Sequence, residues 1–89
     1  MTIISQDSKI VLPYGKYIIK IVNQSDLTSL DVDYDDLIYP WFVIVLVGYD
    51  RVEILARYSA ESKAIQVVNN MVTANCIGED LFRFAKEDL

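Results

Sequence analysis

The sequence contains no histidine and only one cysteine, Cys76, among its 89 residues. A single cysteine cannot form an internal disulfide, and without histidine the usual zinc, copper and haem sites lose their commonest ligand. Histidine is also the side chain used most often as a general base near neutral pH, so Ser-His-Asp and Cys-His triads are excluded within this chain. We therefore expect a protein with no enzymatic activity and no cofactor.

Basic residues are scarce, because eight Lys and Arg side chains stand against thirteen Asp and Glu side chains and the net charge is −5. Such a chain repels a polyanion at long range, so we expect no nucleic-acid partner. The longest apolar run, residues 41–47, is far shorter than the roughly 20 residues of a membrane helix. No basic start precedes an early apolar segment, as it would in a secretory signal. We therefore expect no membrane partner and a cytoplasmic location.

The region most informative about the fold is residues 41–75. The apolar, β-branched run at 41–47 is typical of a central strand covered on both faces. A turn at 48–51 follows, then apolar and polar residues alternate over 52–58, and helical spacing begins after Ser59. This change of hydrophobic period indicates an α+β protein.

Further strands are predicted before that region. Short apolar runs at 2–5 and 9–13, on either side of a polar trio at 6–8, are typical of a hairpin. A third strand at 17–23 has apolar residues on both faces, so we expect both faces to be covered, one by the helix and the other by a loop or a second subunit. In the strand at 52–58, alternate side chains should point to the core, namely Val52, Ile54, Ala56 and Tyr58.

The helix is predicted to begin after Ser59, whose hydroxyl is placed to cap it, and to stop before Gly78. Its apolar residues recur at spacings of three and four and should lie on the sheet; they are Ala64, Ile65, Val67, Val68, Met71 and Val72. The tail at 81–84 either adds an edge strand or packs across the helix. Together the elements predict a single α+β domain over 1–89, an antiparallel, curved sheet of about five strands with the helix across one face.

An acidic loop at 24–40 is inserted between the strands and contains five aspartates but no basic residue. Its carboxylates at alternate positions resemble the start of an EF-hand calcium loop; they are Asp31, Asp33 and Asp35. Asp36 replaces the glycine that the motif requires, and Phe42 replaces its bidentate glutamate. Two interpretations stay open: a looser calcium or magnesium site, or aspartates that only keep an apolar loop solvated.

A second constellation is aromatic, and its members are candidate partner-binding residues: Tyr34, Tyr39, Trp41 and Phe42. Trp and Tyr often anchor protein interfaces. Core packing is the alternative, because ten aromatic residues in 89 must mostly be buried in so small a domain. Cys76 fits a small filler near the helix end better than a nucleophile, since no histidine is present to activate it.

Three stretches resemble a group of small uncharacterised proteins from Gram-positive bacteria and their phages: IISQDSKIV, LARYSAESKAIQVVNNMV and the closing FRF. In that group a start like ISQDK and an ending like LGxYxTEExAxxVLxxI enclose a few strands. The resemblance covers both ends of the chain and leaves the acidic loop without a counterpart. It implies a bacterial or phage source and a small sheet-plus-helix fold, and it brings no biochemical activity and no catalytic residue.

The sequence as a whole predicts a protein-protein interaction module that self-associates, with a homodimer as its expected form. A small sheet often covers an apolar face in this way. The alternative function is a small acidic module that binds a divalent metal or another ligand through the acidic loop. The first function predicts exposed apolar surface and a mass above that of one chain, and the second predicts ordering that depends on an ion.

Overall fold

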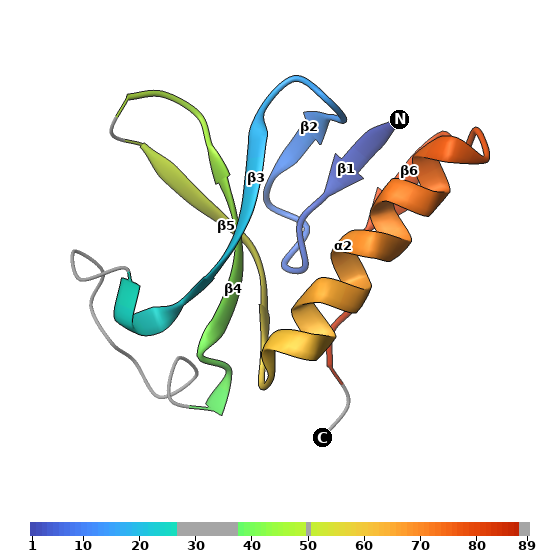
Figure 1. The fold of residues 1–89 in the computed structure, drawn as a ribbon. Coiled ribbons are helices and arrows are strands. Elements are labelled where there is room, and N and C mark those ends of the chain that lie inside the picture. Colours follow the sequence, from blue (N-terminus) through green and yellow to red (C-terminus); the bar gives the residue numbers. More distant parts are fainter. Residues whose placement is uncertain (27–37, 50, 88–89) are drawn as a thin grey trace.

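The computed structural model describes residues 1–26, 38–49 and 51–87. In chain order the elements are β1 (Thr2–Ile4), β2 (Val11–Pro13), β3 (Ile18–Asn23), the 3-10 helix η1 (Gln24–Asp26), β4 (Trp41–Leu46), β5 (Val52–Tyr58), α2 (Glu61–Cys76) and β6 (Leu81–Arg83). Figure 1 shows the strands as two groups, with α2 running beside them. The α+β class that the hydrophobic periods predicted is confirmed.

The strands form two sheets of three strands each, ordered β2-β1-β6 and β3-β4-β5. The prediction of one curved sheet of about five strands is therefore only partly correct. The β1–β2 hairpin does not continue into β3; instead β1 pairs in parallel with β6, from the far end of the sequence. The tail thus supplies an edge strand, which was one of the two alternatives for it.

Strand β4 is the central strand of its sheet, and its residues 42–45 are at most 3% exposed, as its apolar sequence predicted. Strand β3 lies at the edge, where Ile18 is 61% exposed and Lys20 is also exposed. Its Ile19 and Ile21 pack against the core, and α2 contacts this strand, as predicted for one face. On the other face Ile18 is exposed and Val22 is half-buried, so the cover of that face by a loop or a second subunit stays a prediction.

Strand β5 contains an irregularity that reverses part of the predicted alternation. Val43 pairs with Ala56 but the next residue, Ile44, pairs with Ile54, so Leu55 is the extra residue of a β-bulge. Leu55 is 1% exposed and belongs to the core, whereas Val52 is 38% exposed. The prediction that Val52 and Ile54 point to the core is wrong, and that for Ala56 and Tyr58 is confirmed.

Helix α2 ends where predicted, but its N-cap differs from the predicted one. Its N-cap is Ala60, with no side-chain cap, so the prediction that Ser59 caps the helix is wrong. At the other end Gly78 has a φ of +84°, and the Glu79 and Gly78 amides donate to the Ala74 and Asn75 carbonyls. This is a Schellman motif, and glycine suits its left-handed residue.

The core lies between the two sheets and α2, and all three contribute to it. Ile3 and Phe84 come from the β2-β1-β6 side, Val43 and Val45 come from β4, and the remaining buried members include Leu55, Ala56, Tyr58, Ala64 and Met71. The sheets do not cover the whole apolar face of α2, because Ile65 and Val72 are 42% and 41% exposed. The prediction that these two residues pack on the sheet is wrong.

Candidate functional site

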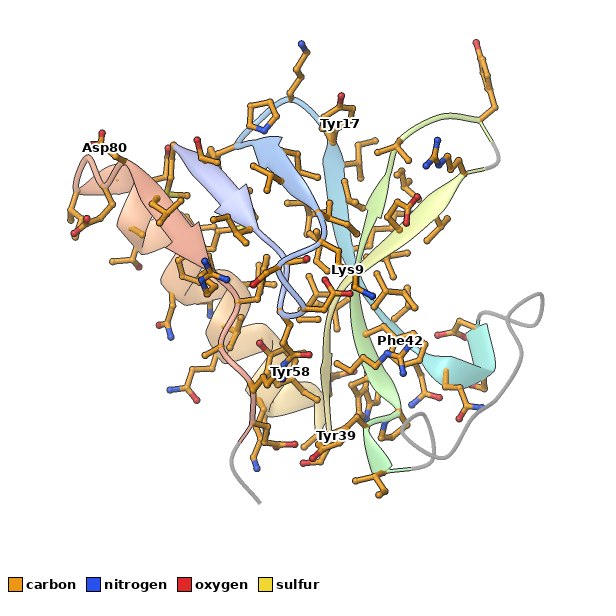
Figure 2. All side chains as sticks on the ribbon, turned by 180° about the vertical axis from the view of Figure 1, so that it is seen from behind. Lys9, Tyr17, Tyr39, Phe42, Tyr58 and Asp80 are labelled. Carbon is orange, nitrogen blue, oxygen red and sulfur yellow. The ribbon has the colours of Figure 1, made fainter. Side chains whose placement is uncertain are left out.

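The two sheets meet along a seam between the β1–β2 hairpin and strand β5. One end of the seam is closed by hydrogen bonds from Gln6, and the other end opens into a groove. Figure 2 shows Tyr58 and Tyr39 toward the closed end and Tyr17 toward the open end. The groove at the open end is larger than the cavity beside Gln6 at the closed end, with volumes of about 770 Å³ and 230 Å³.

At the closed end, the Gln6 side chain pairs with the backbone of β5 much as a neighbouring strand would. Its Oε1 accepts from the Arg57 amide at 3.1 Å, and its Nε2 donates to the Arg57 carbonyl at 3.4 Å and to the Ala85 carbonyl at 3.0 Å. The Gln6 amide donates to the Leu55 carbonyl at 2.7 Å. One residue therefore joins the hairpin, β5 and the C-terminal segment.

The turn that places Gln6 is held by its neighbours. The Ser5 hydroxyl, which is fully buried, donates to Asp7 Oδ1 at 2.6 Å and accepts from the Ile10 amide at 3.0 Å. The same Asp7 oxygen accepts from the Lys9 amide at 3.0 Å. The Ser5 hydrogen bond is the main reason that the pKa of Asp7 lies below its ordinary value. The SQD stretch of the resemblance thus forms a turn network.

Glu87 fastens the C-terminal segment beside the closed end. Its carboxylate accepts from the Ser59 hydroxyl at 2.6 Å and from the Ser59 amide at 3.1 Å, and it lies 2.5 Å from Lys63 Nζ. Burial raises the pKa of Glu87, but the bonds from Lys63 and Ser59 outweigh it and leave that pKa below its ordinary value. Ser59 therefore holds the tail of the chain instead of capping α2.

Tyr58 is a buried titratable group at the same end. Its hydroxyl donates to the Ala85 carbonyl at 2.9 Å. Burial, with a smaller contribution from the Glu87 charge, raises the pKa of Tyr58 to about 12. The phenol is therefore a structural donor near neutral pH, and it is too weak an acid to act as a general acid or base there.

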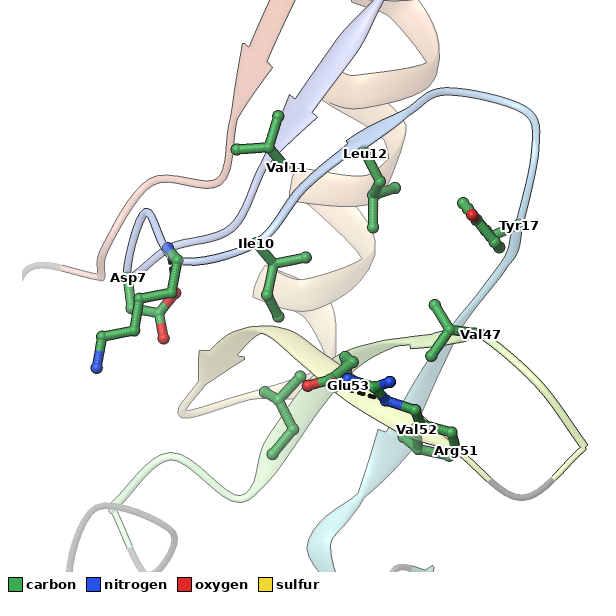
Figure 3. Close-up of a pocket in the computed structure, with 11 residues that line it drawn as sticks. Asp7, Ile10, Val11, Leu12, Tyr17, Val47, Arg51, Val52 and Glu53 are labelled. Carbon is green, nitrogen blue, oxygen red and sulfur yellow. Dashed lines mark hydrogen bonds and ion pairs between the residues drawn. The ribbon is translucent and has the colours of Figure 1, made fainter.

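At the open end the groove has a volume of about 770 Å³. Its apolar lining comes from both sheets and includes Ile10, Leu12, Tyr17, Val47, Val52 and Ile54. Figure 3 shows Ile10 and Leu12 pointing from the hairpin toward β5, with Val47 and Tyr17 at one side. Four charged residues also line it, two of each sign: Asp7, Lys9, Arg51 and Glu53. Arg51 and Glu53 form an exposed ion pair at 2.9 Å.

Three of the residues that line this groove are exposed apolar side chains. Val11 is 62% exposed, and Tyr17 and Val52 are each 38% exposed. A second set of exposed apolar residues lies on α2 and just beyond it: Ile65, Val72, Ile77 and Leu81. The first set lines a groove of mixed apolar and charged character, which is the form of an interaction site.

The predicted aromatic site residues lie apart from this groove. Phe42 is 1% exposed, with the Arg57 guanidinium 5.4 Å from its ring centre, and Trp41 is half-buried against the core. Tyr39 lines a smaller cavity of about 230 Å³ together with Gln6 and Glu87. Tyr34 and the candidate metal ligands lie outside the described residues; those ligands are Asp31, Asp33 and Asp35.

In the described residues, histidine, cysteine and carboxylate side chains nowhere form a group of three that could hold a metal ion. Within 1–26, 38–49 and 51–87, no helix has the length and apolar character that a membrane span requires. Cys76 is exposed at the end of α2 rather than semi-buried.

Sequence reasoning missed both ends of the seam. Gln6 belonged to a trio interpreted only as a hairpin loop, and Glu87 to an acidic tail. The exposed Val11 and Ile18 were assigned to strands with no sign of what lay beside them. Comparison with family models, curated proteins and solved structures gave no match to this chain.

Proposed function

We propose that this chain is a protein-protein interaction module that self-associates, and that its interaction site is the groove at the open end of the seam. The observation that carries the proposal is the combination of a groove of about 770 Å³ with exposed apolar side chains in its lining. Val11 is 62% exposed and Val52 is 38% exposed, and burying such side chains against a partner would contribute favourable free energy to binding.

The proposed role requires binding and no catalysis. It includes a homodimer as the form of the chain, and the cytoplasm of a bacterium, or of a bacterium infected by its phage, as the setting that the sequence resemblance implies. Tyr34, Tyr39 and Trp41 stay predicted partner-binding residues, whereas Phe42 is buried in the chain itself. The alternative function, a divalent-metal or ligand-binding module, depends on Asp31, Asp33 and Asp35 and stays a prediction.

The experiment that tests the proposal measures the solution mass by size-exclusion chromatography with light scattering, at low and high salt and with and without calcium. We expect twice the chain mass of 10.2 kDa, persisting at high salt because apolar burial is not screened. Self-association that required calcium would favour the metal-binding alternative. A mass of one chain in every condition would contradict self-association.

A matched pair of variants locates the interface. Val52 in the groove and Ile65 on α2 are 38% and 42% exposed, so an aspartate at either position should disturb folding to a similar, small degree. We expect Val52→Asp to reduce the mass to that of one chain and Ile65→Asp to leave the dimer intact. The reverse pattern would place the interface on the helix and refute the groove as the site.

A further inference from the structure

Tyr49 is the most exposed large apolar side chain in the described residues. It lies in the loop between β4 and β5, and its exposure of 111% means that no other described residue covers it. A tyrosine buries roughly 150–250 Å² when it is fully covered, and it does so at a small cost in side-chain entropy. An aromatic ring held out in solvent at a hairpin tip is therefore a natural anchor for a contact.

The groove lies next to this tip. Arg51 and Val52 follow Tyr49 closely in the same hairpin and line the groove, as does Val47 before it. A volume of about 770 Å³ exceeds what one aromatic side chain occupies. The exposed Tyr49 ring and the groove therefore lie near each other on the surface. The ring lies outside the groove of its own chain, so a contact between the two has to involve a second copy.

We propose that the occupant of the groove is the Tyr49 ring of a second copy of this chain, exchanged reciprocally about a two-fold axis. In such an isologous interface, the tip of each copy enters the groove of the other, so both contacts form together. This inference deepens the proposed function and rests on it, since it names which residue of which partner fills the site.

The charges around the groove suit a second copy. The chain has a net charge of −5, yet the groove is lined by two acidic and two basic residues, so the groove lining itself adds no net charge to the repulsion between two copies. The opposite signs of Lys9 and Glu53 also allow pairing across a two-fold axis. A strongly acidic or basic partner would find no matching charge at this surface.

A stable interface buries about 800 Å² per partner, which is roughly one seventh of the 5819 Å² surface of this chain. Tyr49, together with Val11, Tyr17 and Val52 in the groove lining, provides an apolar centre for such a patch. These residues come from two segments that are distant in sequence, 11–17 and 49–52.

The test compares Tyr49→Ser with Tyr49→Phe by light scattering over a range of concentrations. Loss of a central aromatic anchor weakens an interface about thirty-fold or more, so we expect Tyr49→Ser to raise the dimer dissociation constant by at least about that factor. Tyr49→Phe keeps the ring and should dimerise within a few-fold of the parent chain. Because Tyr49 is fully exposed, both variants should keep the urea midpoint of the parent monomer.

A photoreactive benzoylphenylalanine at position 49, in a mixture of isotopically light and heavy chains, identifies the neighbour directly. We expect crosslinks between light and heavy chains that map to residues 9–12 or 51–54. A dimer that survives Tyr49→Ser, with crosslinks elsewhere, would overturn the exchange while leaving self-association standing. A parent chain that is monomeric at every concentration, its groove then left to a different protein, would overturn both.

Discussion

The two ends of the seam between the sheets use the same strand in opposite ways. At the closed end, the Leu55 carbonyl and both backbone groups of Arg57 are paired with Gln6. At the open end, the first residues of β5 face a groove with apolar walls. Backbone groups that are already paired with a side chain cannot pair with the backbone of a partner, so addition of a partner strand is blocked at the closed end.

The difference also concerns the kind of interaction. The closed end holds buried polar groups in a network with Tyr58 and Glu87, so its strength depends on every bond being made. The open end holds apolar side chains such as Val11 and Val52, which have no polar groups to leave unpaired but remain partly in water. We therefore expect changes at the closed end to affect folding and changes at the open end to affect association.

The largest expected effect comes from substitutions at two neighbouring residues of β5, one in the core and one in the groove. Leu55 is 1% exposed and Ile54 lines the groove, so Leu55→Ala should cost about 3 kcal/mol of unfolding free energy and Ile54→Ala about 1 kcal/mol. Urea unfolding of a Cys76→Ser background measures both. Equal losses, or a greater loss at Ile54, would contradict the bulge that turns Leu55 into the core.

The next effect is that of Gln6→Ala, which removes three side-chain hydrogen bonds and opens the closed end. At about 1 kcal/mol for each bond, we expect a loss of 2 to 3 kcal/mol, measured by urea unfolding. Gln66→Ala is the matched control, because Gln66 is an exposed helical residue and its loss should change stability by less than about 0.5 kcal/mol. Similar values for the two variants would show that Gln6 does not join the sheets.

The contrast between these two glutamines also shows what the sequence could predict. The hydrophobic period predicted β1 to β5 and α2 to within a few residues, and the glycine at position 78 marked the helix end, because these signals are local. It left the tail that forms β6 with two alternatives. Gln6 carries no local signal. Its partners Arg57 and Ala85 are distant in sequence. Its role in joining the hairpin to β5 therefore depends on how the two sheets are arranged, which the hydrophobic period does not specify.

The bulge and the groove were unpredictable for a related reason. A strict alternation over 52–58 assigns Leu55 to the outer face and Val52 and Ile54 to the core. The extra residue of the bulge exchanges the two faces from Leu55 back to the start of the strand. The chain forms two sheets because β1 pairs with β6, a strand from the opposite end of the chain. The groove exists only because of that division, so its residues could be assigned to strands but not to a site.

A smaller effect is expected from Tyr58→Phe, which removes the hydrogen bond to the Ala85 carbonyl and should cost about 1 kcal/mol at neutral pH. Folding raises the pKa of Tyr58 from 10.0 to about 12, so its neutral form contributes stability that is complete below pH 10 and is lost as pH rises through about 12. Unfolding free energies measured across this range should fall less steeply in the variant. Parallel curves would contradict the burial of the phenol.

The smallest effect concerns Glu87→Gln, which keeps an acceptor for Ser59 but removes the charge that faces Lys63, and should cost under about 1 kcal/mol at neutral pH. Folding lowers the pKa of Glu87 from 4.5, so its contribution is present above that value and is lost as pH falls through the lower folded value. The parent and variant should therefore converge in stability in acid.

Glu79→Gln provides the control for this convergence, because Glu79 is exposed and lies outside the closed end. Chemical unfolding from neutral to acid pH should show a difference from the parent for Glu87→Gln only. The association constant should be unchanged in both variants, since the C-terminal fastening and the groove lie at opposite ends of the seam. A Glu87→Gln variant that folded normally but dimerised poorly would mean that the two ends are coupled, and that tightening the closed end helps to shape the open one.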